Sequence, residues 1–285
     1  MPSKLYTLGA IISFFGVANA HVAAWSRGMY CLNGTKPGVD DKDNSVPVFP
    51  LFKLSKKDWW MQGITGCVNF PPPEGEFLEL PANGEIKVEL ATNRGFTTLG
   101  WGDRLTKFVG PIDVPEDQFG KSGQCITNPN IHTMNETTAA GTAFAIAYKS
   151  DPLAVQPEEL TVFTVLEHTP WFREVTYEIP DLPACPEGGC VCAWGWVPDG
   201  CGEPNMYMQP FKCIVTGTPG SRAVAPAKPP VYCENSPQAC TPGAKQMVYY
   251  NQLEGNNIEF VQAKGNPTYN GRLGFQNGRQ TDIFM

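Results

Sequence analysis

The stretch Glu85-Ile86-Lys87-Val88-Glu89-Leu90 decides the fold class, because charged and apolar residues alternate along it one by one. Successive side chains of a β-strand point to opposite faces, so this pattern predicts a strand with one buried and one exposed face. The stretch Arg173-Glu174-Val175-Thr176-Tyr177-Glu178-Ile179 alternates in the same way. Both stretches therefore predict strands that cover an apolar core.

Three further runs have the length and composition of strands, being rich in β-branched and aromatic residues. They are residues 143–148, 160–166 and 206–215. Clusters of Pro, Gly and acidic residues separate the runs, as in FPPPEGE at 70–76 and LPACPEGGC at 182–190. Such clusters end strands and form turns. Only Lys-Lys-Asp-Trp-Trp at 56–60 suggests a short helix. We therefore predict an all-β fold, an immunoglobulin-like antiparallel β-sandwich with long disulfide-stapled loops.

The first twenty residues, MPSKLYTLGAIISFFGVANA, have the pattern of a secretory signal peptide. Lys4 precedes an apolar run, and Ala18-Asn19-Ala20 places small residues where signal peptidase requires them. The alternative is a membrane anchor, but the run is shorter than the roughly 20 apolar residues of a transmembrane helix, and no later segment reaches that length. We therefore expect residues 1–20 to be removed, and a secreted, extracellular chain that begins at His21.

A change of composition divides the rest of the chain. Residues 216–230, TGTPGSRAVAPAKPP, are rich in Pro and Ala, and the residues beyond them have few apolar side chains. A segment of that size with so thin a core does not fold easily by itself. We expect a β-sandwich at 21–217 and an extension at 218–285 packed on that domain, with its last 15 to 20 residues loose.

Ten cysteines follow the leader, an even number that predicts five disulfides in an oxidising compartment. Cys190 and Cys192 lie close together in one short run, and each is expected to pair elsewhere rather than with the other. Cys233 and Cys240 bracket a short turn-rich loop that allows a local bridge. Trp194 and Trp196 follow Cys192, and we expect both in a disulfide-rich core.

The charge of the chain excludes two classes of partner. The formal net charge is −7, and loss of Lys4 with the leader makes it −8. Nucleic acids and anionic membranes both require clustered Lys and Arg, so neither is an expected partner. A mildly acidic chain suits a neutral substrate. The sequons Asn33-Gly34-Thr35 and Asn135-Glu136-Thr137 predict N-glycosylation sites in a secreted protein.

His21 is the strongest single signal in the sequence. Only three residues are histidine, so by chance one stands at the first mature position about once in a hundred times. A terminal histidine offers its α-amino nitrogen and its imidazole Nδ1 to one metal ion. Both groups lose their protons easily at mild pH, with ordinary pKa values of about 8 and about 6.5. A second histidine would complete a nitrogen-rich, T-shaped site, which favours copper. The alternative for His21 is a solvated chain end.

Two histidines compete for the second ligand position. His132 lies in the polar loop Asn128-Pro129-Asn130-Ile131-His132, and loops that leave a rigid sandwich commonly carry ligands. His168 follows the apolar run 160–166, and a histidine at a strand end is commonly a hydrogen-bonded structural residue. We therefore expect His132 to bind the metal, with His168 behind it or delivering protons.

The mature start, His21-Val22-Ala23-Ala24-Trp25-Ser26-Arg27-Gly28-Met29-Tyr30-Cys31-Leu32-Asn33-Gly34, resembles fungal lytic polysaccharide monooxygenases, most closely those of auxiliary activity family 14. The resemblance extends to Cys67 and to residues 126–135, 205–213 and 243–258, and so covers nearly the whole mature chain. It implies a histidine brace of His21 and His132 with Tyr207 as the axial residue. It also implies a hydrogen-bonding Asn205 and, more loosely, a supporting role for His168. Tyr177 is the competing axial residue, but its alternating strand reads as ordinary packing.

The resemblance also implies the reaction. One copper ion would use O2 or H2O2 and an external electron donor or redox partner to break polysaccharide chains by oxidation. The family has been associated with xylan on cellulose fibres, so that substrate is expected by analogy, together with a monomeric protein that does not bind membranes.

Other functions stay open at this point. A copper-binding protein can keep the brace without cleaving polysaccharide, and the ligands alone do not decide between the two. A hydrolase with paired carboxylates has the residues available among 28 Asp and Glu, but no flanking pattern marks a pair. The Asn135 sequon lies three residues after His132, so the loop turns it outward, or the sequon is empty, or the surface is not a flat platform.

Overall fold

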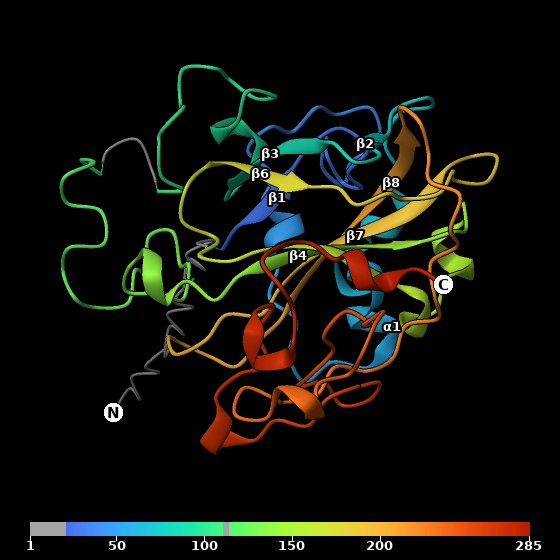
Figure 1. The fold of residues 1–285 in the computed structure, drawn as a ribbon. Helices are drawn as coiled ribbons and strands as arrows, with labels where there is room; N and C mark the ends of the chain where they lie inside the picture. Colours follow the sequence, from blue (N-terminus) through green and yellow to red (C-terminus); the bar gives the residue numbers. More distant parts are fainter. Residues whose placement is uncertain (1–20, 111–113) are drawn as a thin grey trace, which may run out of the picture.

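The computed structural model describes residues 21–110 and 114–285, so the predicted signal peptide lies outside the described residues. The chain forms two β-sheets that pack face to face (Figure 1). The smaller sheet has three antiparallel strands in the order β1 (Ala23–Trp25), β3 (Glu85–Ala91), β6 (Glu174–Glu178). The larger sheet has six strands in the order β2 (Leu78–Pro81), β8 (Tyr207–Thr216), β7 (Cys190–Trp196), β4 (Thr142–Ala147), β5 (Thr161–Leu166), β9 (Gly278–Arg279). The predicted all-β sandwich is confirmed.

The alternating stretches form the expected strands. The stretch at 85–90 forms β3, and that at 173–179 forms β6, with Ile86 opposite Tyr177 and Val88 opposite Val175. These four side chains are buried, so the alternation selects the face that meets the larger sheet. The runs 143–148, 160–166 and 206–215 form β4, β5 and β8 within one or two residues of the predicted ends.

Two features of the sheets differ from expectation. β2 pairs with β8 in parallel, so the larger sheet is mixed and the sandwich is not antiparallel throughout. The central strand β7, Cys-Val-Cys-Ala-Trp-Gly-Trp, is buried at every position. A strand covered on both faces shows no alternation, which is why the period-two pattern does not reveal it.

Helical structure is scarce in the described part of the chain. The α-helix α1 (Lys56–Trp59) lies within the predicted 56–60. The short 3-10 turns are Val46–Val48, Trp60–Thr65, Cys67–Asn69, Arg94–Phe96, Glu136–Thr138, Pro152–Ala154, Pro157–Glu159, Pro237–Ala239, Gln262–Lys264, Gly271–Leu273 and Thr281–Ile283. None of the helices in the described ranges is long and apolar enough to cross a membrane.

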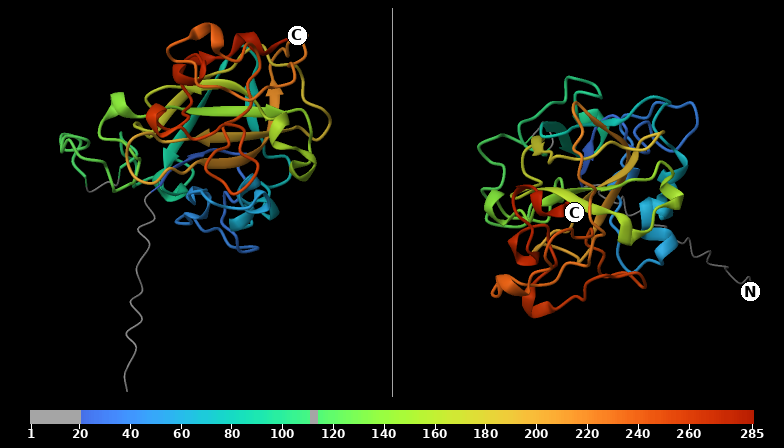
Figure 2. Two further views of the ribbon diagram at one scale, coloured as in Figure 1. Left: turned by 90° about the horizontal axis from the view of Figure 1, so that it is seen from below. Right: turned by 45° about the vertical axis from the view of Figure 1, so that its right-hand side comes forward.

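Two apolar cores cover the two faces of the larger sheet. One lies between the sheets and contains Phe144, Trp194, Trp196 and Phe211. The other lies on the outer face and joins sheet residues to the C-terminal extension, for example through Tyr250. Figures 1 and 2 show the extension, orange to red, along that outer face while the smaller sheet covers the other face. The extension therefore completes a core of the sandwich, and the division at residue 217 stays a prediction.

The end of the extension is not loose, contrary to expectation. β9 pairs with β5, and the Gln280 N–H donates to the Phe163 carbonyl at 2.9 Å. Ile283 is 1% exposed. The polar composition hid this docking, because backbone pairing to a sheet edge does not require apolar side chains.

Five disulfides are present, as predicted. They are Cys31–Cys67, Cys125–Cys201, Cys185–Cys190, Cys192–Cys213 and Cys233–Cys240. Cys190 and Cys192 pair elsewhere, and Cys233 pairs with Cys240, which confirms both expectations. Trp194 and Trp196 lie beside these bridges and are fully buried.

One end of the sandwich gathers the loops that matter for function. His21 precedes β1, and β1 runs antiparallel to β3, so His21 lies near the end of β3. Trp196 at the end of β7 lies opposite Tyr207 at the start of β8 and next to Thr142 at the start of β4. The loop that leads into β4 carries His132. His21, His132 and Tyr207 are therefore brought to the same end by the strand order.

Candidate metal centre

His21 and His132 lie side by side although they are far apart in sequence. Their rings stack with centroids 5.2 Å apart and planes at 21°. The ring of Tyr207 lies 5.3 Å from that of His21. The three residues that the sequence singled out as ligands are thus brought together.

The protein fixes the orientation of His132. Its Nδ1 lies 2.5 Å from the Cys201 carbonyl oxygen, so Nδ1–H donates to that carbonyl. This contact leaves the lone pair on Nε2, which lies 3.0 Å from the Tyr207 hydroxyl. His132 has a positive φ of 50°, an uncommon backbone conformation for a residue with a side chain. The ring is therefore held with Nε2 toward Tyr207 and His21.

The loop from β7 to β8, residues 197–206, supports His132 from behind. The Cys125–Cys201 disulfide joins this loop to the segment that carries His132. Gly202 has a positive φ of 82°, and a Cβ there would lie 2.7 Å from His132 Nδ1. Only glycine avoids both the strain and the collision. The loop can approach the imidazole this closely because residue 202 has no side chain.

Tyr207 begins β8 and forms the floor of the cluster. Its ring stacks on Trp196 with centroids 4.4 Å apart, and Trp196 meets His132 edge to face at 5.6 Å. The competing axial residue, Tyr177, lies in the core between the sheets, where its hydroxyl bonds to Thr142 and Trp194. The structure thus brings Tyr207, and not Tyr177, to the histidines.

Asn130 links the two histidines, a role that the sequence reading did not assign. Its Oδ1 accepts from the His132 N–H at 3.3 Å, and its Nδ2 lies 3.4 Å from His21 Nε2. Because Asn130 contacts Nε2 of His21, the Nδ1 atom on the other edge of that ring remains available as a ligand. The sequence feature that could have revealed Asn130 is its position in a polar loop, two residues before the candidate ligand His132.

Asn205 lies next to Tyr207, as the resemblance implies. It is 2% exposed, and its Oδ1 has no hydrogen-bond partner among the residues that the structure describes. Burying an amide oxygen without a partner is costly. A buried, unpartnered acceptor beside a ligand cluster is typical of a site that holds another group.

His168 is not part of this cluster. It is exposed, and it follows β5, which lies three strands from β8 in the larger sheet. At the usual strand spacing this separation is about 14 Å. His168 instead lines a hollow with Glu167 and Arg272.

The electrostatics keep both imidazoles neutral. Burial, together with the nearby His132, lowers the pKa of His21 from 6.5 to about 4, although the Glu203 carboxylate opposes the shift. Burial also lowers the pKa of His132, against the Cys201 hydrogen bond and Glu203. Burial raises the pKa of Tyr207 well above 10, so its hydroxyl keeps its proton. Neutral imidazoles are the form that binds metals.

The donor set fits copper better than a structural metal. Among residues 21–110 and 114–285, no three His, Cys, Asp or Glu side chains gather to hold an ion. Two imidazoles and a phenol do converge, and a free amine at residue 21 would add a third nitrogen. Nitrogen-rich sites of this kind suit copper. The residues present therefore fit a single copper ion.

The two sequon asparagines differ in exposure and in their hydrogen bonds. Asn135 is exposed and caps the turn 136–138, with its Oδ1 accepting from the Thr138 N–H at 3.0 Å. The His132 side chain is buried and turned toward Cys201, whereas Asn135 is exposed, so the two side chains lie in different environments despite their closeness in sequence. Asn33 is half-buried, and its Oδ1 accepts from Arg94 Nη1 at 2.7 Å.

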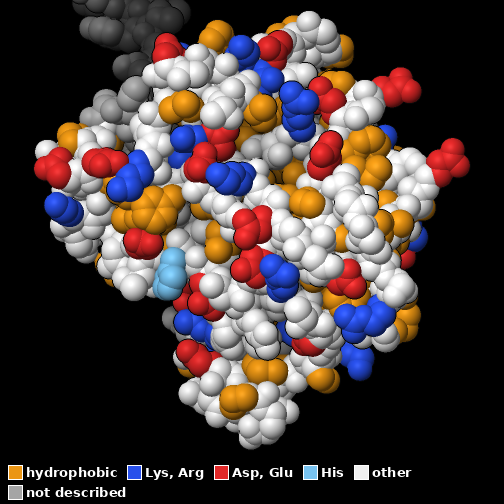
Figure 3. All heavy atoms as spheres, turned by 45° about the horizontal axis from the view of Figure 1, so that its top comes forward, with side chains coloured by type: hydrophobic (Ala, Val, Ile, Leu, Met, Phe, Trp, Pro, Cys, Tyr) orange, Lys and Arg blue, Asp and Glu red, His pale blue; other side chains and the backbone are white. Residues whose placement is uncertain are grey.

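The surface shows how charge is distributed. On the face drawn in Figure 3, Lys and Arg side chains are interspersed with Asp and Glu. Such mixing gives no broad basic field on that face.

Comparison with known proteins gives one consistent match. The family model described as lytic polysaccharide monooxygenase AA14 matches residues 3–285. AA14 family lytic polysaccharide monooxygenase A of Trametes coccinea (strain BRFM310) is 35% identical over 98% of this chain, which spans 64% of that protein's length. AA14 family lytic polysaccharide monooxygenase B of Pycnoporus cinnabarinus is 36% identical over 98% of this chain and 74% of its own length. The B protein of Talaromyces rugulosus is 36% identical over 99% of this chain and 98% of its own length.

Proposed function

The chain belongs to the AA14 family of lytic polysaccharide monooxygenases, and from that premise we propose that it is a secreted copper enzyme that oxidatively breaks plant cell-wall polysaccharide, namely xylan associated with cellulose. The observation that carries the proposal is the convergence of His21, His132 and Tyr207 at one end of the sandwich. After cleavage behind Ala20, the amine and Nδ1 of His21 and Nε2 of His132 would hold one copper ion, with the Tyr207 hydroxyl beside them.

Bound copper would supply a one-electron redox centre at which O2 or H2O2, with electrons from an external donor, is activated to remove hydrogen from a sugar carbon beside the glycosidic bond. The protein's own part is to hold the ligands before the metal arrives. The Cys201 carbonyl sets the tautomer and direction of His132, and Asn130 holds the two histidines at a fixed separation. Groups that orient a ligand in this way contribute to metal affinity and to the properties of the bound ion.

The buried side of the site keeps water away. Tyr207 is 3% exposed and covered by the fully buried Trp196. Its hydroxyl stays protonated because burial raises its pKa. It therefore presents a neutral oxygen that fills one side of the site and donates no charge. The Asn205 amide beside it offers a hydrogen-bonding group to whatever occupies the adjoining space.

The open side of the site faces solvent through His21. That residue is half-exposed, while His132 and Tyr207 beneath it are buried. The ring and the surrounding loops lie at one end of the sandwich. A polymer on a solid surface can therefore approach the ring from that end. We propose a monomer that acts on this polymer with a reductant or redox partner and binds neither nucleic acid nor membrane.

The test is product release from xylan-coated cellulose. Copper-loaded protein produced with its native leader should release oxidised oligosaccharides only with a reductant and O2 or H2O2. His132→Ala should lower this release at least a hundredfold, while Glu187→Ala at the opposite end of the sandwich should match the parent. Tight copper binding without oxidised products from xylan or cellulose would reject the enzymatic function and leave a copper-binding protein.

A further inference from the structure

Two hollows on the C-terminal extension share a wall. The first has a volume of about 450 Å³ and lies beside Tyr232 and Lys264. The second has a volume of about 410 Å³ and lies beside Thr137 and His168. Glu234 and Arg272 line both hollows, so the two adjoin, and we call them together the tail groove.

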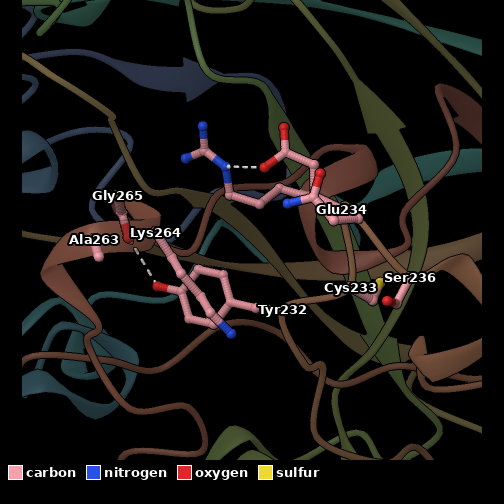
Figure 4. Close-up of a pocket in the computed structure, with 9 residues that line it drawn as sticks. Tyr232, Cys233, Glu234, Ser236, Ala263, Lys264 and Gly265 are labelled. Atoms are coloured by element: carbon pink, nitrogen blue, oxygen red, sulfur yellow. Dashed lines mark hydrogen bonds and ion pairs between the residues drawn. The ribbon is translucent and has the colours of Figure 1, made fainter.

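The walls of the tail groove are held in place by the protein itself. Figure 4 shows the Lys264 side chain across the ring of Tyr232, whose hydroxyl donates to the Gly265 carbonyl at 2.9 Å. The Cys233–Cys240 disulfide closes one side, and Asn270 Nδ2 donates to the Ala140 carbonyl at 3.1 Å. A groove built in advance loses little conformational entropy when a ligand binds.

The tail groove adjoins both segments that build the candidate metal centre. Arg272 Nη1 donates to Asp199 Oδ2 at 2.5 Å, and Asp199 stands two residues before Cys201, whose carbonyl orients His132. Two residues of extended chain span at most about 7 Å. On the other side, Thr137 follows His132 by five residues in the same loop. The tail groove therefore borders the two chain segments, the 197–206 loop and the loop after His132, that also build the candidate metal centre.

The charges of the groove suit a neutral ligand. Two cations, Lys264 and Arg272, and two carboxylates, Glu234 and Glu167, line the groove, and the Glu234 carboxylate lies 3.6 Å from Arg272 Nε. A polyanion would meet the two carboxylates and a polycation the two cations, so either is opposed. The amide, hydroxyl and carboxylate groups of the lining match the hydroxyls of a neutral sugar chain.

We propose that the tail groove binds a segment of the neutral polysaccharide chain whose neighbouring segment lies over the candidate metal centre. The proposal rests on the proposed function for the identity of that chain. It also gives His168 a place, because its exposed ring lines the groove and faces the sugar hydroxyls there. The extension would thus serve the reaction by aligning the polymer, besides completing the second core.

Oligosaccharide binding by the metal-free protein tests this. Titration with xylohexaose, followed by calorimetry or NMR, should show binding, and the acidic hexamer of galacturonic acid should bind at least tenfold more weakly. Glu234→Trp, which places a large ring in both hollows, should weaken xylohexaose binding at least tenfold. Glu187→Trp puts the same ring on an exposed glutamate at the opposite end of the sandwich and should change nothing.

A second variant guards against misfolding of the first. Asn235→Ala combined with Lys264→Ala shortens two exposed side chains of the groove and should weaken binding at least threefold. Unchanged affinity in a Glu234→Trp protein with the parent's melting temperature would overturn the proposal, as would a parent that binds no xylohexaose. If the parent releases oxidised products but Glu234→Trp binds xylohexaose as tightly as the parent, the groove proposal alone is rejected. Groove binding without oxidised products would support the groove and reject the proposed function.

Discussion

The Nδ1 atom of His132 lies 2.5 Å from the carbonyl oxygen of Cys201. A backbone carbonyl thus chooses the imidazole tautomer and aims the other nitrogen at Tyr207 and His21. Cys201 is itself fixed by its disulfide to Cys125, which stands at the start of the segment carrying His132. The two segments that meet at this hydrogen bond are therefore covalently joined, and the geometry of the site exists before any metal binds.

Gly202 should be indispensable for this arrangement. Gly202→Ala would place a Cβ 2.7 Å from His132 Nδ1, so the ring or the loop must move. We expect copper affinity, measured by calorimetry, to fall at least tenfold, which is about 1.4 kcal/mol. Gly200→Ala is the matched control, since residue 200 also has a positive φ but its Cβ would meet nothing within 4 Å. Both changes should cost about 1–2 kcal/mol of stability for the left-handed backbone, and equal loss of copper affinity would refute the collision.

Tyr207→Phe should change the bound copper, whereas Tyr177→Phe should change only the stability of the fold. Tyr207→Phe removes a hydroxyl 3.0 Å from His132 Nε2 and should change the EPR spectrum of bound copper. Tyr177→Phe leaves Thr142 and Trp194 without their buried partner and should lower the free energy of unfolding by about 1–3 kcal/mol, with an unchanged spectrum. A spectrum altered by Tyr177→Phe alone would contradict the axial assignment.

Asn130 should matter for copper although it is not a ligand. Asn130→Ala removes both the bond from the His132 N–H and the contact with His21 Nε2. We expect copper affinity to fall about tenfold, the lower end of what outer-shell partners contribute. Asn135→Ala, an exposed asparagine in the same loop, should leave affinity unchanged. Equal affinities in all three proteins would remove Asn130 from the site.

Acid should destabilise the metal-free protein through His21. The folded pKa of about 4 lies below the ordinary 6.5, so the unfolded chain binds more protons between these values. The stability contributed by neutral His21 is present above pH 6.5 and is lost as pH falls toward 4. Chemical denaturation should therefore show a steeper loss of stability over this range in the parent than in His21→Gln. Identical slopes would show that His21 is not buried as described.

Much of the fold could be predicted because alternating strands show themselves in sequence. The stretches at 85–90 and 173–179 each bury one face, so their patterns match the observed pairing of Val88 with Val175. The central strand β7 is buried on both faces and has no such pattern. β9 contributes two residues to an edge, which is too short for any pattern.

The site divides in the same way. His21 and Tyr207 could be proposed because a processed terminus and a family resemblance point to single residues. Asn130, Glu203 and Gly202 could not, because their roles depend on distances between loops that the sequence does not contain. His168 was expected near the metal as the remaining histidine and by a loose family resemblance, whereas the strand order places β5, which it follows, three strands from β8.

The central claim is that the free amine of His21 and the imidazoles of His21 and His132 hold one copper ion. The most direct measurement compares EPR spectra and copper affinity of protein that begins at His21 with protein that keeps Ala20 in front of it. We predict a type 2 copper signal and tight binding of one ion only when His21 is terminal, with loss of both in His21→Ala. Equal copper binding by the Ala20-extended protein would contradict the account.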